Sequence, residues 1–162
     1  MRNQIVRLLT VVLLLLTAAS EGCRWYDGGE QQAVSTQPCP VTIPNGSQPP
    51  TKMLSGPLMH GNGKLWVGLS PDGIWLVKPL RNGSLPTKFA WWREVAGPLT
   101  LEGHRLDKPR ESFHSASARD YGESGFIPSS ANFSSAGCWE VTGKVNDTAL
   151  TFVVDVRARN RK

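Results

Sequence analysis

The sequence predicts an all-β domain of two packed antiparallel sheets, for three reasons. The turn-forming dipeptides Asn62-Gly63, Asp72-Gly73 and Asn82-Gly83 follow one another at ten-residue spacing, which suits short strands joined by tight turns. The segment 138–156 alternates apolar and polar residues, as half-buried strands do. The chain has no long apolar pattern of helical period, so the partner that covers one sheet should be a second sheet.

Residues 1–20 are typical of a secretory signal peptide. Arg2 and Arg7 make the start positive, an apolar run extends from Leu8 to Leu16, and small residues follow up to Ser20. Cleavage after Ser20 would leave small side chains at the −3 and −1 positions. The apolar run is shorter than the roughly 20 residues of a membrane-spanning helix. We therefore expect export from the cytoplasm.

Cys23 leaves two alternatives open for the mature chain. Bacterial lipoproteins carry a box of small residues before an acylated cysteine, and here Gly22 fits that box whereas Glu21 does not. Three cysteines in an exported chain leave one without a partner, and acylation of Cys23 would use it. The chain is therefore expected to be either secreted or lipid-anchored to the cell membrane, with membrane contact only through Cys23.

The rest of the chain divides into a tether, one domain and a short tail. Residues 21–38 are rich in polar residues and lack a hydrophobic period, which predicts a flexible tether. The domain spans 39–156, and residues 41–43 could add an edge strand at its start. Residues 157–162 form a basic tail.

Strands inside the domain are predicted from β-branched and aromatic residues. We expect the strands between the three turn dipeptides, 64–69 and 74–78, to belong to a meander. Two further strands, 89–94 and 99–106, should flank the turn at 96–98, and the last two, 138–145 and 149–156, should form a hairpin around Asn146-Asp147. The inward face of the hairpin should carry Trp139 and Val141 on its first strand, and Leu150, Phe152, Val154 and Val156 on its second. Residues 107–130 are polar and irregular, so a long loop is expected there.

The stretch Gly137-Cys138-Trp139-Glu140-Val141-Thr142 resembles the penultimate strand of immunoglobulin-like domains. Over nearly all of 39–156, the chain resembles a family of uncharacterised bacterial exported proteins and lipoproteins. The stretches that carry this resemblance are 39–46, 60–63, 65–69, 88–93, 99–107, 121–126, 137–145 and 150–153. The resemblance implies an extracytoplasmic, immunoglobulin-like antiparallel β-sandwich. It implies no reaction and no ligand.

The residues alone leave three disulfide pairings open among Cys23, Cys39 and Cys138. The family pattern contains Cys39 and Cys138 but need not contain Cys23, so the resemblance implies a Cys39–Cys138 bond. The alternative is a local Cys23–Cys39 bridge on the tether. A disulfide suits the oxidising compartment that the signal peptide implies.

Trp91, Trp92 and Arg93 are the candidate ligand-binding residues. Neighbouring residues of a strand point to opposite faces, so one tryptophan should lie inside and the other outside. An exposed aromatic side chain contributes to binding when it belongs to a surface patch. We therefore predict an exported, non-catalytic binding or envelope-associated module whose partner is an envelope protein or a glycan. Carbohydrate or cell-wall binding through the exposed tryptophan is one alternative.

A small extracytoplasmic hydrolase is the other alternative. His104 and Asp107, with Ser112 or Ser115, supply the residue types of a catalytic triad. A triad is defined by geometry, however, and no nucleophile-elbow pattern accompanies these residues. We therefore predict that the chain is not an enzyme.

Metal, cofactor and nucleic-acid functions are not expected. The three histidines do not have ligand spacing, and the sequence has no Cys-x-x-Cys pair. The formal charge of +5 comes mainly from the signal peptide and the tail, because residues 39–156 carry 11 basic and 10 acidic residues, a net of +1. A nearly neutral domain does not favour nucleic-acid binding.

Overall fold

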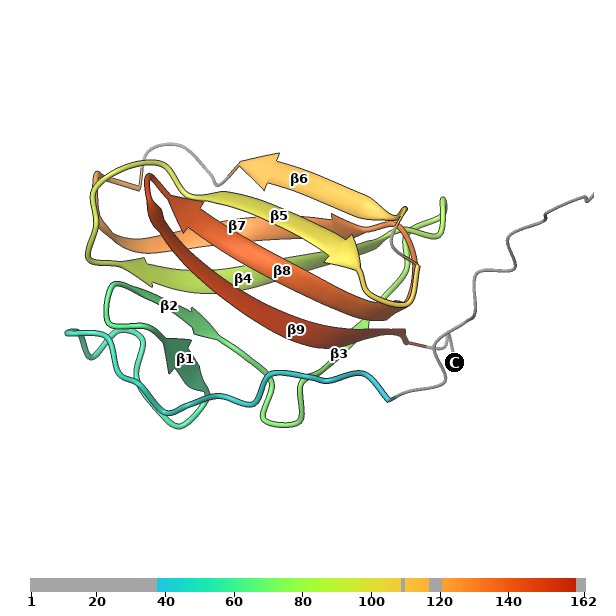
Figure 1. Ribbon diagram of the computed structural model, residues 1–162, viewed down its shortest axis with the longest axis horizontal. Helices are drawn as coiled ribbons and strands as arrows, with labels where there is room; N and C mark the ends of the chain where they lie inside the picture. Colours follow the sequence, from blue (N-terminus) through green and yellow to red (C-terminus); the bar gives the residue numbers. More distant parts are fainter. Residues whose placement is uncertain (1–37, 109, 117–120, 160–162) are drawn as a thin grey trace, which may run out of the picture. The chain divides into compact units, whose positions relative to one another are not determined.

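The computed structural model describes residues 38–108, 110–116 and 121–159. These residues form nine strands in two sheets and no helix (Figure 1). The predicted all-β architecture of two mostly antiparallel sheets is therefore confirmed. Within these ranges, no helix is long and apolar enough to span a bilayer. The expected signal peptide, Cys23 and nearly all of the tether lie outside the described residues.

The first sheet has four antiparallel strands in the order β1-β2-β4-β7, which are β1 (Met59–Gly61), β2 (Leu65–Gly68), β4 (Leu85–Arg93) and β7 (Gly125–Phe133). The second sheet has five strands in the order β3-β9-β8-β5-β6, which are β3 (Ile74–Val77), β9 (Thr148–Ala158), β8 (Gly137–Val145), β5 (Thr100–Arg105) and β6 (Ser112–Ala116). Only the pairing of β3 with β9 is parallel.

The expected turns are present, but the strands between them do not form a meander. Gly63, Gly73 and Gly83 have φ values of 86°, 67° and 84°, as tight turns at these glycines require. The expectation of a meander is wrong because β2 pairs with β1 and β4, whereas β3 joins the other sheet beside β9. A turn dipeptide fixes where the chain reverses, and burial of the apolar faces decides which strand becomes the neighbour.

The prediction of a long loop at 107–130 is also wrong, because this segment contains β6 and most of β7. In β7, Ser129 and Ala131 are buried although they are small or polar. Their neighbour across the sheet is β4, where Phe89 lies opposite Ser129. Ser129 is therefore buried beside the buried ring of Phe89, and small or polar buried residues give β7 little hydrophobic signal of its own.

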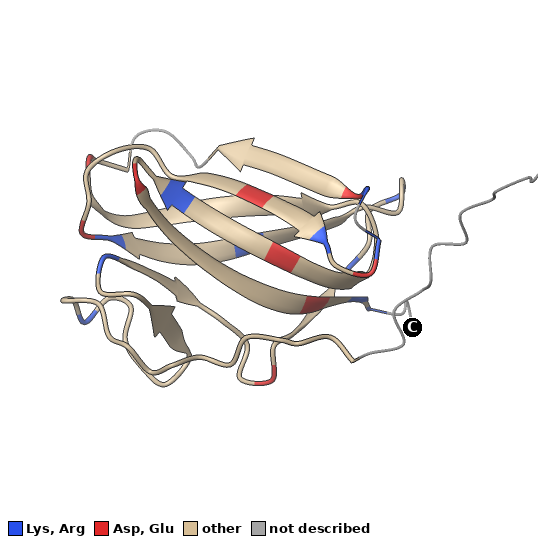
Figure 2. Cartoon of the chain, in the orientation of Figure 1, with Lys and Arg blue, Asp and Glu red and all other residues tan. Residues whose placement is uncertain are grey.

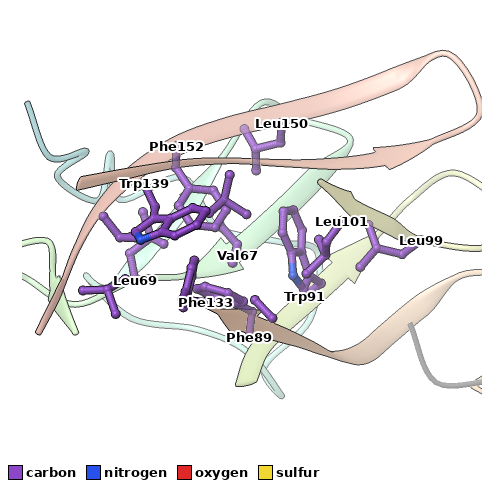
Figure 3. Close-up of a cluster of buried hydrophobic side chains, with 14 of the residues drawn as sticks. Val67, Leu69, Phe89, Trp91, Leu99, Leu101, Phe133, Trp139, Leu150 and Phe152 are labelled. Atoms are coloured by element: carbon purple, nitrogen blue, oxygen red, sulfur yellow. The ribbon is translucent and has the colours of Figure 1, made fainter. Parts of the chain in front are cut away.

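Between the sheets lies a core of aromatic and aliphatic side chains (Figure 3). Trp139 packs on Phe133 with ring centroids 5.2 Å apart, and Phe89 packs on Phe152 at 5.3 Å. The predicted inward face of the C-terminal hairpin is confirmed. Its buried residues are Trp139, Val141, Leu150, Phe152, Val154 and Val156.

Residues 38–50, which we call the strap, run along the edges of both sheets (Figure 1). A disulfide joins Cys39 to Cys138 of β8, as the resemblance implied. Thr42 exchanges two hydrogen bonds of 2.8 Å with the backbone of Val153, one through its N–H and one through its hydroxyl oxygen. Residues 41–43 thus follow the edge of β9, although they do not form a regular strand.

Candidate functional site

The outer face of the four-stranded sheet carries three neighbouring aromatic side chains, Trp92, Phe126 and Tyr121, which we call the aromatic strip. Trp92 of β4 lies directly opposite Phe126 of β7 in the sheet register. The ring centroids of Phe126 and Tyr121 are 6.1 Å apart. Trp92 and Phe126 are half-buried, and Tyr121 is 43% exposed. The strip therefore joins aromatic surface from two strands and the loop that precedes β7.

Alternation along β4 decides which tryptophan belongs to the strip. Trp91 is 0% exposed and lies in the core, so it is the inward ring and Trp92 is the outward one. Arg93 is 1% exposed. Of the three candidate binding residues, Trp92 alone reaches the surface. Trp91 and Arg93 are not positioned to touch an external ligand.

A hydrogen bond orients the Trp92 ring. Its Nε1–H donates a hydrogen bond of 2.7 Å to Oε1 of Glu94. Gly125 lies next to the far edge of the ring, where a Cβ atom would sit 3.8 Å from Trp92 Cη2. A ring that is already oriented loses less conformational entropy when a ligand binds. The exposed Glu94 also places a carboxylate beside the aromatic surface.

Arg93 is buried beneath the strip and bonds to the loops that flank it. Its guanidinium donates hydrogen bonds to the carbonyl oxygens of Gly97, Gly122 (3.1 Å) and Tyr121 (3.4 Å). These bonds tie the loop after β4 to the loop before β7, and they fix the backbone that carries the Tyr121 ring. Burial lowers the pKa of Arg93, and the negative charge of Glu123 partly opposes this effect. Arg93 is thus a positioning residue of the strip.

A second feature is a shallow depression of about 480 Å³ on the outer face of the five-stranded sheet. Its polar lining comes from β5, β6 and β8 and consists of Glu102, His104, Ser112, His114, Glu140 and Thr142. His104 lies opposite both Ser112 and Glu140 in the register, and its Nε2 atom is 3.8 Å from Oε1 of Glu140. Figure 2 shows acidic residues in the middle of β5 and β8 on this sheet.

The residues of the hydrolase hypothesis do not form a triad. Asp107 faces away from His104 and binds the buried Arg105 at 2.7 and 2.8 Å. Ser115 donates a hydrogen bond of 2.6 Å to the backbone of Ser130. Across the described ranges, no hydrogen bond connects Ser112 with His104. A nucleophile, a base and an orienting acid are therefore not connected.

The described part of the chain also contains no group of three or more histidine, cysteine, aspartate or glutamate side chains arranged to hold a metal ion. His104 and His114 share the depression, whereas His60 lies on β1 of the other sheet. Burial lowers the pKa of His60, which favours its neutral form.

Sequence reasoning identified Trp92 but missed Phe126 and Tyr121. Both lie in the segment that was expected to be a loop, so nothing placed them beside β4. The available signal was spacing: Phe126, Pro128 and Ser130 follow one another at every second position, as residues on one face of a strand do. Comparison of the chain with protein-family models, curated proteins and solved structures found no match.

Proposed function

We propose that this chain is an exported, non-catalytic binding module whose ligand surface is the aromatic strip. The observation that carries the proposal is the meeting of Trp92, Phe126 and Tyr121 on one sheet face, with Trp92 already oriented by Glu94. Partly exposed aromatic groups that form a patch are typical of binding surfaces. Two of the three rings, Trp92 and Phe126, stand on regular strands, which position side chains better than loops do.

The proposed location is outside the cytoplasm. It is supported by the signal-like sequence at 1–20, by the resemblance to bacterial exported proteins and lipoproteins, and by the Cys39–Cys138 disulfide. Within this proposal the domain is an immunoglobulin-like sandwich, and Cys23 is the point where a lipid anchor would attach. Intact mass of the native protein tests the anchor, because acylation at Cys23 and cleavage after Ser20 give different masses.

A glycan of the cell envelope is the ligand class that best fits the strip. The flat apolar faces of sugar rings stack on aromatic side chains, and sugar hydroxyl groups donate hydrogen bonds to a carboxylate such as Glu94. The exposed Tyr121 supplies a second ring and a hydroxyl group. An envelope protein that stacks a side chain on the strip is the other outcome that the experiment distinguishes.

The test is binding of the purified protein to isolated cell-wall polysaccharide, with the Trp92→Ala and Tyr121→Ala variants beside the wild type. We expect each variant to lose affinity by roughly tenfold or more, as central aromatic contacts usually do. Met53→Ala is the matched control, because Met53 is 68% exposed and lies outside the strip. Wild-type affinity in both strip variants, with their fold intact by circular dichroism, would refute the proposal. Binding to an envelope protein but not to polysaccharide would show that the ligand of the strip is a protein and not a glycan.

A further inference from the structure

Among the described residues, the two sheets have four edge strands, and three of these edges are covered. The strap covers β1 through hydrogen bonds from Gly46 N–H to Met59 and between Asn45 and Gly61. Strands β6 and β7 lie beside each other, and Ser115 of β6 bonds to Ser130 of β7. The remaining edge belongs to β3.

The free edge of β3 is centred on Leu76. Gly73 and Val77 direct their carbonyl oxygens to β9, where they accept hydrogen bonds of 2.9 Å from Asp155 and 2.8 Å from Arg159. Alternation along a strand therefore turns the N–H and C=O of Leu76 outward. In the part of the chain that the structure describes, no hydrogen bond reaches either group. Unpaired edge groups of this kind are a template for another strand.

The surface beside this edge is largely apolar, with Ser70, Asp72 and Arg159 as its polar residues. A groove of about 550 Å³ lies along β3, and its apolar lining includes Leu58, Leu69, Ile74, Trp75 and Leu76. Leu58 is 45% exposed and Leu76 is 58% exposed. The buried indole N–H of Trp75 finds no acceptor among the described residues. The edge thus combines free backbone groups with apolar surface that a second strand would cover.

We propose that β3 is a self-association edge, where it pairs antiparallel with β3 of a second copy of this chain. A two-fold axis at Leu76 lets the N–H and C=O of each Leu76 bond to the same groups of the other copy. The same register brings the Lys78 N–H of each copy to the Ile74 carbonyl of the other. The Ile74 N–H is not needed, since it already donates to the Asp72 side chain at 3.0 Å.

Charge complementarity favours a second copy over an unrelated strand. Asp72 precedes β3 and Lys78 follows it, and both are exposed. In the antiparallel register about Leu76, Asp72 of each copy becomes a diagonal neighbour of Lys78 of the other. Opposite charges at such positions stabilise a strand pair, whereas a parallel arrangement would bring like charges together. Because the edge lies on the five-stranded sheet, this inference does not depend on the aromatic strip.

Sedimentation velocity of the natively processed full chain, measured over a concentration series, tests the proposal. We expect a monomer–dimer equilibrium for the wild type. Leu76→Lys places two like charges opposite each other at the two-fold axis, so the dimer Kd should rise about fivefold. Met53→Lys is the control, because it adds the same charge at an exposed residue outside the groove, and it should dimerise as the wild type does.

A cross-link tests the register. In a Cys23→Ser background, Leu76→Cys would place two thiols across the axis at a Cα separation of about 5.5 Å, within disulfide range. Mild oxidation should then give a covalent dimer, and Met53→Cys in the same background should not. A chain that stays monomeric at every concentration, or a dimer that Leu76→Lys leaves unchanged, would overturn the proposal.

Discussion

Removal of the Cys39–Cys138 disulfide should lower the stability of the domain by several kcal/mol. The bond joins residues 99 positions apart. In the chain-entropy model, closing a loop of about 100 residues restricts the unfolded chain by about 4.7 kcal/mol, and measured values are commonly 2–4 kcal/mol. The bond also anchors the strap, whose Thr42 pairs with Val153. We expect Cys39→Ala/Cys138→Ala to lose about 3–4 kcal/mol.

The measurement is equilibrium unfolding in guanidinium chloride, followed by tryptophan fluorescence. The double variant should unfold at lower denaturant than the wild type, and reduction of the wild type should give a similar shift. Cys23→Ser is the control and should unfold as the wild type does, because Cys23 takes no part in this bond. A loss below about 1 kcal/mol would refute the loop-entropy reasoning and show that the unfolded chain is already restricted.

Three further perturbations follow from the core and the loops. Gly143→Ala would place a Cβ atom 2.3 Å from the Trp91 ring, so it should cost about 1–3 kcal/mol in urea unfolding. Arg93→Met removes the donor that three loop carbonyls share, and a loss of about 3 kcal/mol is expected in the same assay. A hydrogen bond from Ser135 lowers the pKa of Glu111 below its ordinary 4.5. The ionised Glu111 carboxylate stabilises the folded state fully above pH 4.5, and this stabilisation is lost as pH falls through the lowered pKa of the folded state. Glu111→Gln should therefore reduce the dependence of the unfolding free energy on pH in the acid range.

The Gly143 and Arg93 variants each have a matched comparison in the same chain. Gly68→Ala should be tolerated, because its Cβ would meet nothing within 4 Å. Arg81→Met changes the charge by the same amount at an exposed residue and should cost little. For Glu111, a variant that loses stability equally at pH 7 and at pH 4 would contradict the proposed linkage.

The sequence predicted the burial of a side chain correctly where that burial follows from the alternation of apolar and polar residues within one strand. The C-terminal hairpin shows this, since Leu150, Phe152 and Val154 alternate with residues of the opposite face and all three are buried. Alternation likewise placed the two neighbouring tryptophans of β4 on opposite faces. The Cys39–Cys138 bond came from a resemblance, because spacing alone left three pairings open.

The remaining features depend on contacts between distant segments. β7 was missed because its buried Ser129 and Ala131 owe their burial to β4 rather than to their own hydrophobicity. The pairing of β3 with β9 joins Ile74 to Asp155, and no local pattern encodes a partner so far along the chain. The aromatic strip depends on the same missed strand, so only Trp92 could be identified before the pairing of β4 with β7 was known.

The two proposed surfaces together predict how the protein should bind a polymer. The β3 edge belongs to the five-stranded sheet and the aromatic strip to the outer face of the other sheet, so pairing through β3 leaves both strips of a dimer uncovered. When one strip of a dimer binds a polymer with repeated sites, the second strip is held close to the next site, which raises its effective concentration there. Leu76→Lys should therefore weaken binding to polymeric glycan while leaving the affinity for one soluble repeat unchanged. Trp92→Ala should weaken both. Unchanged polymer binding by a monomeric Leu76→Lys protein would show that one strip suffices, and loss of both affinities would show that the edge and the strip are not independent.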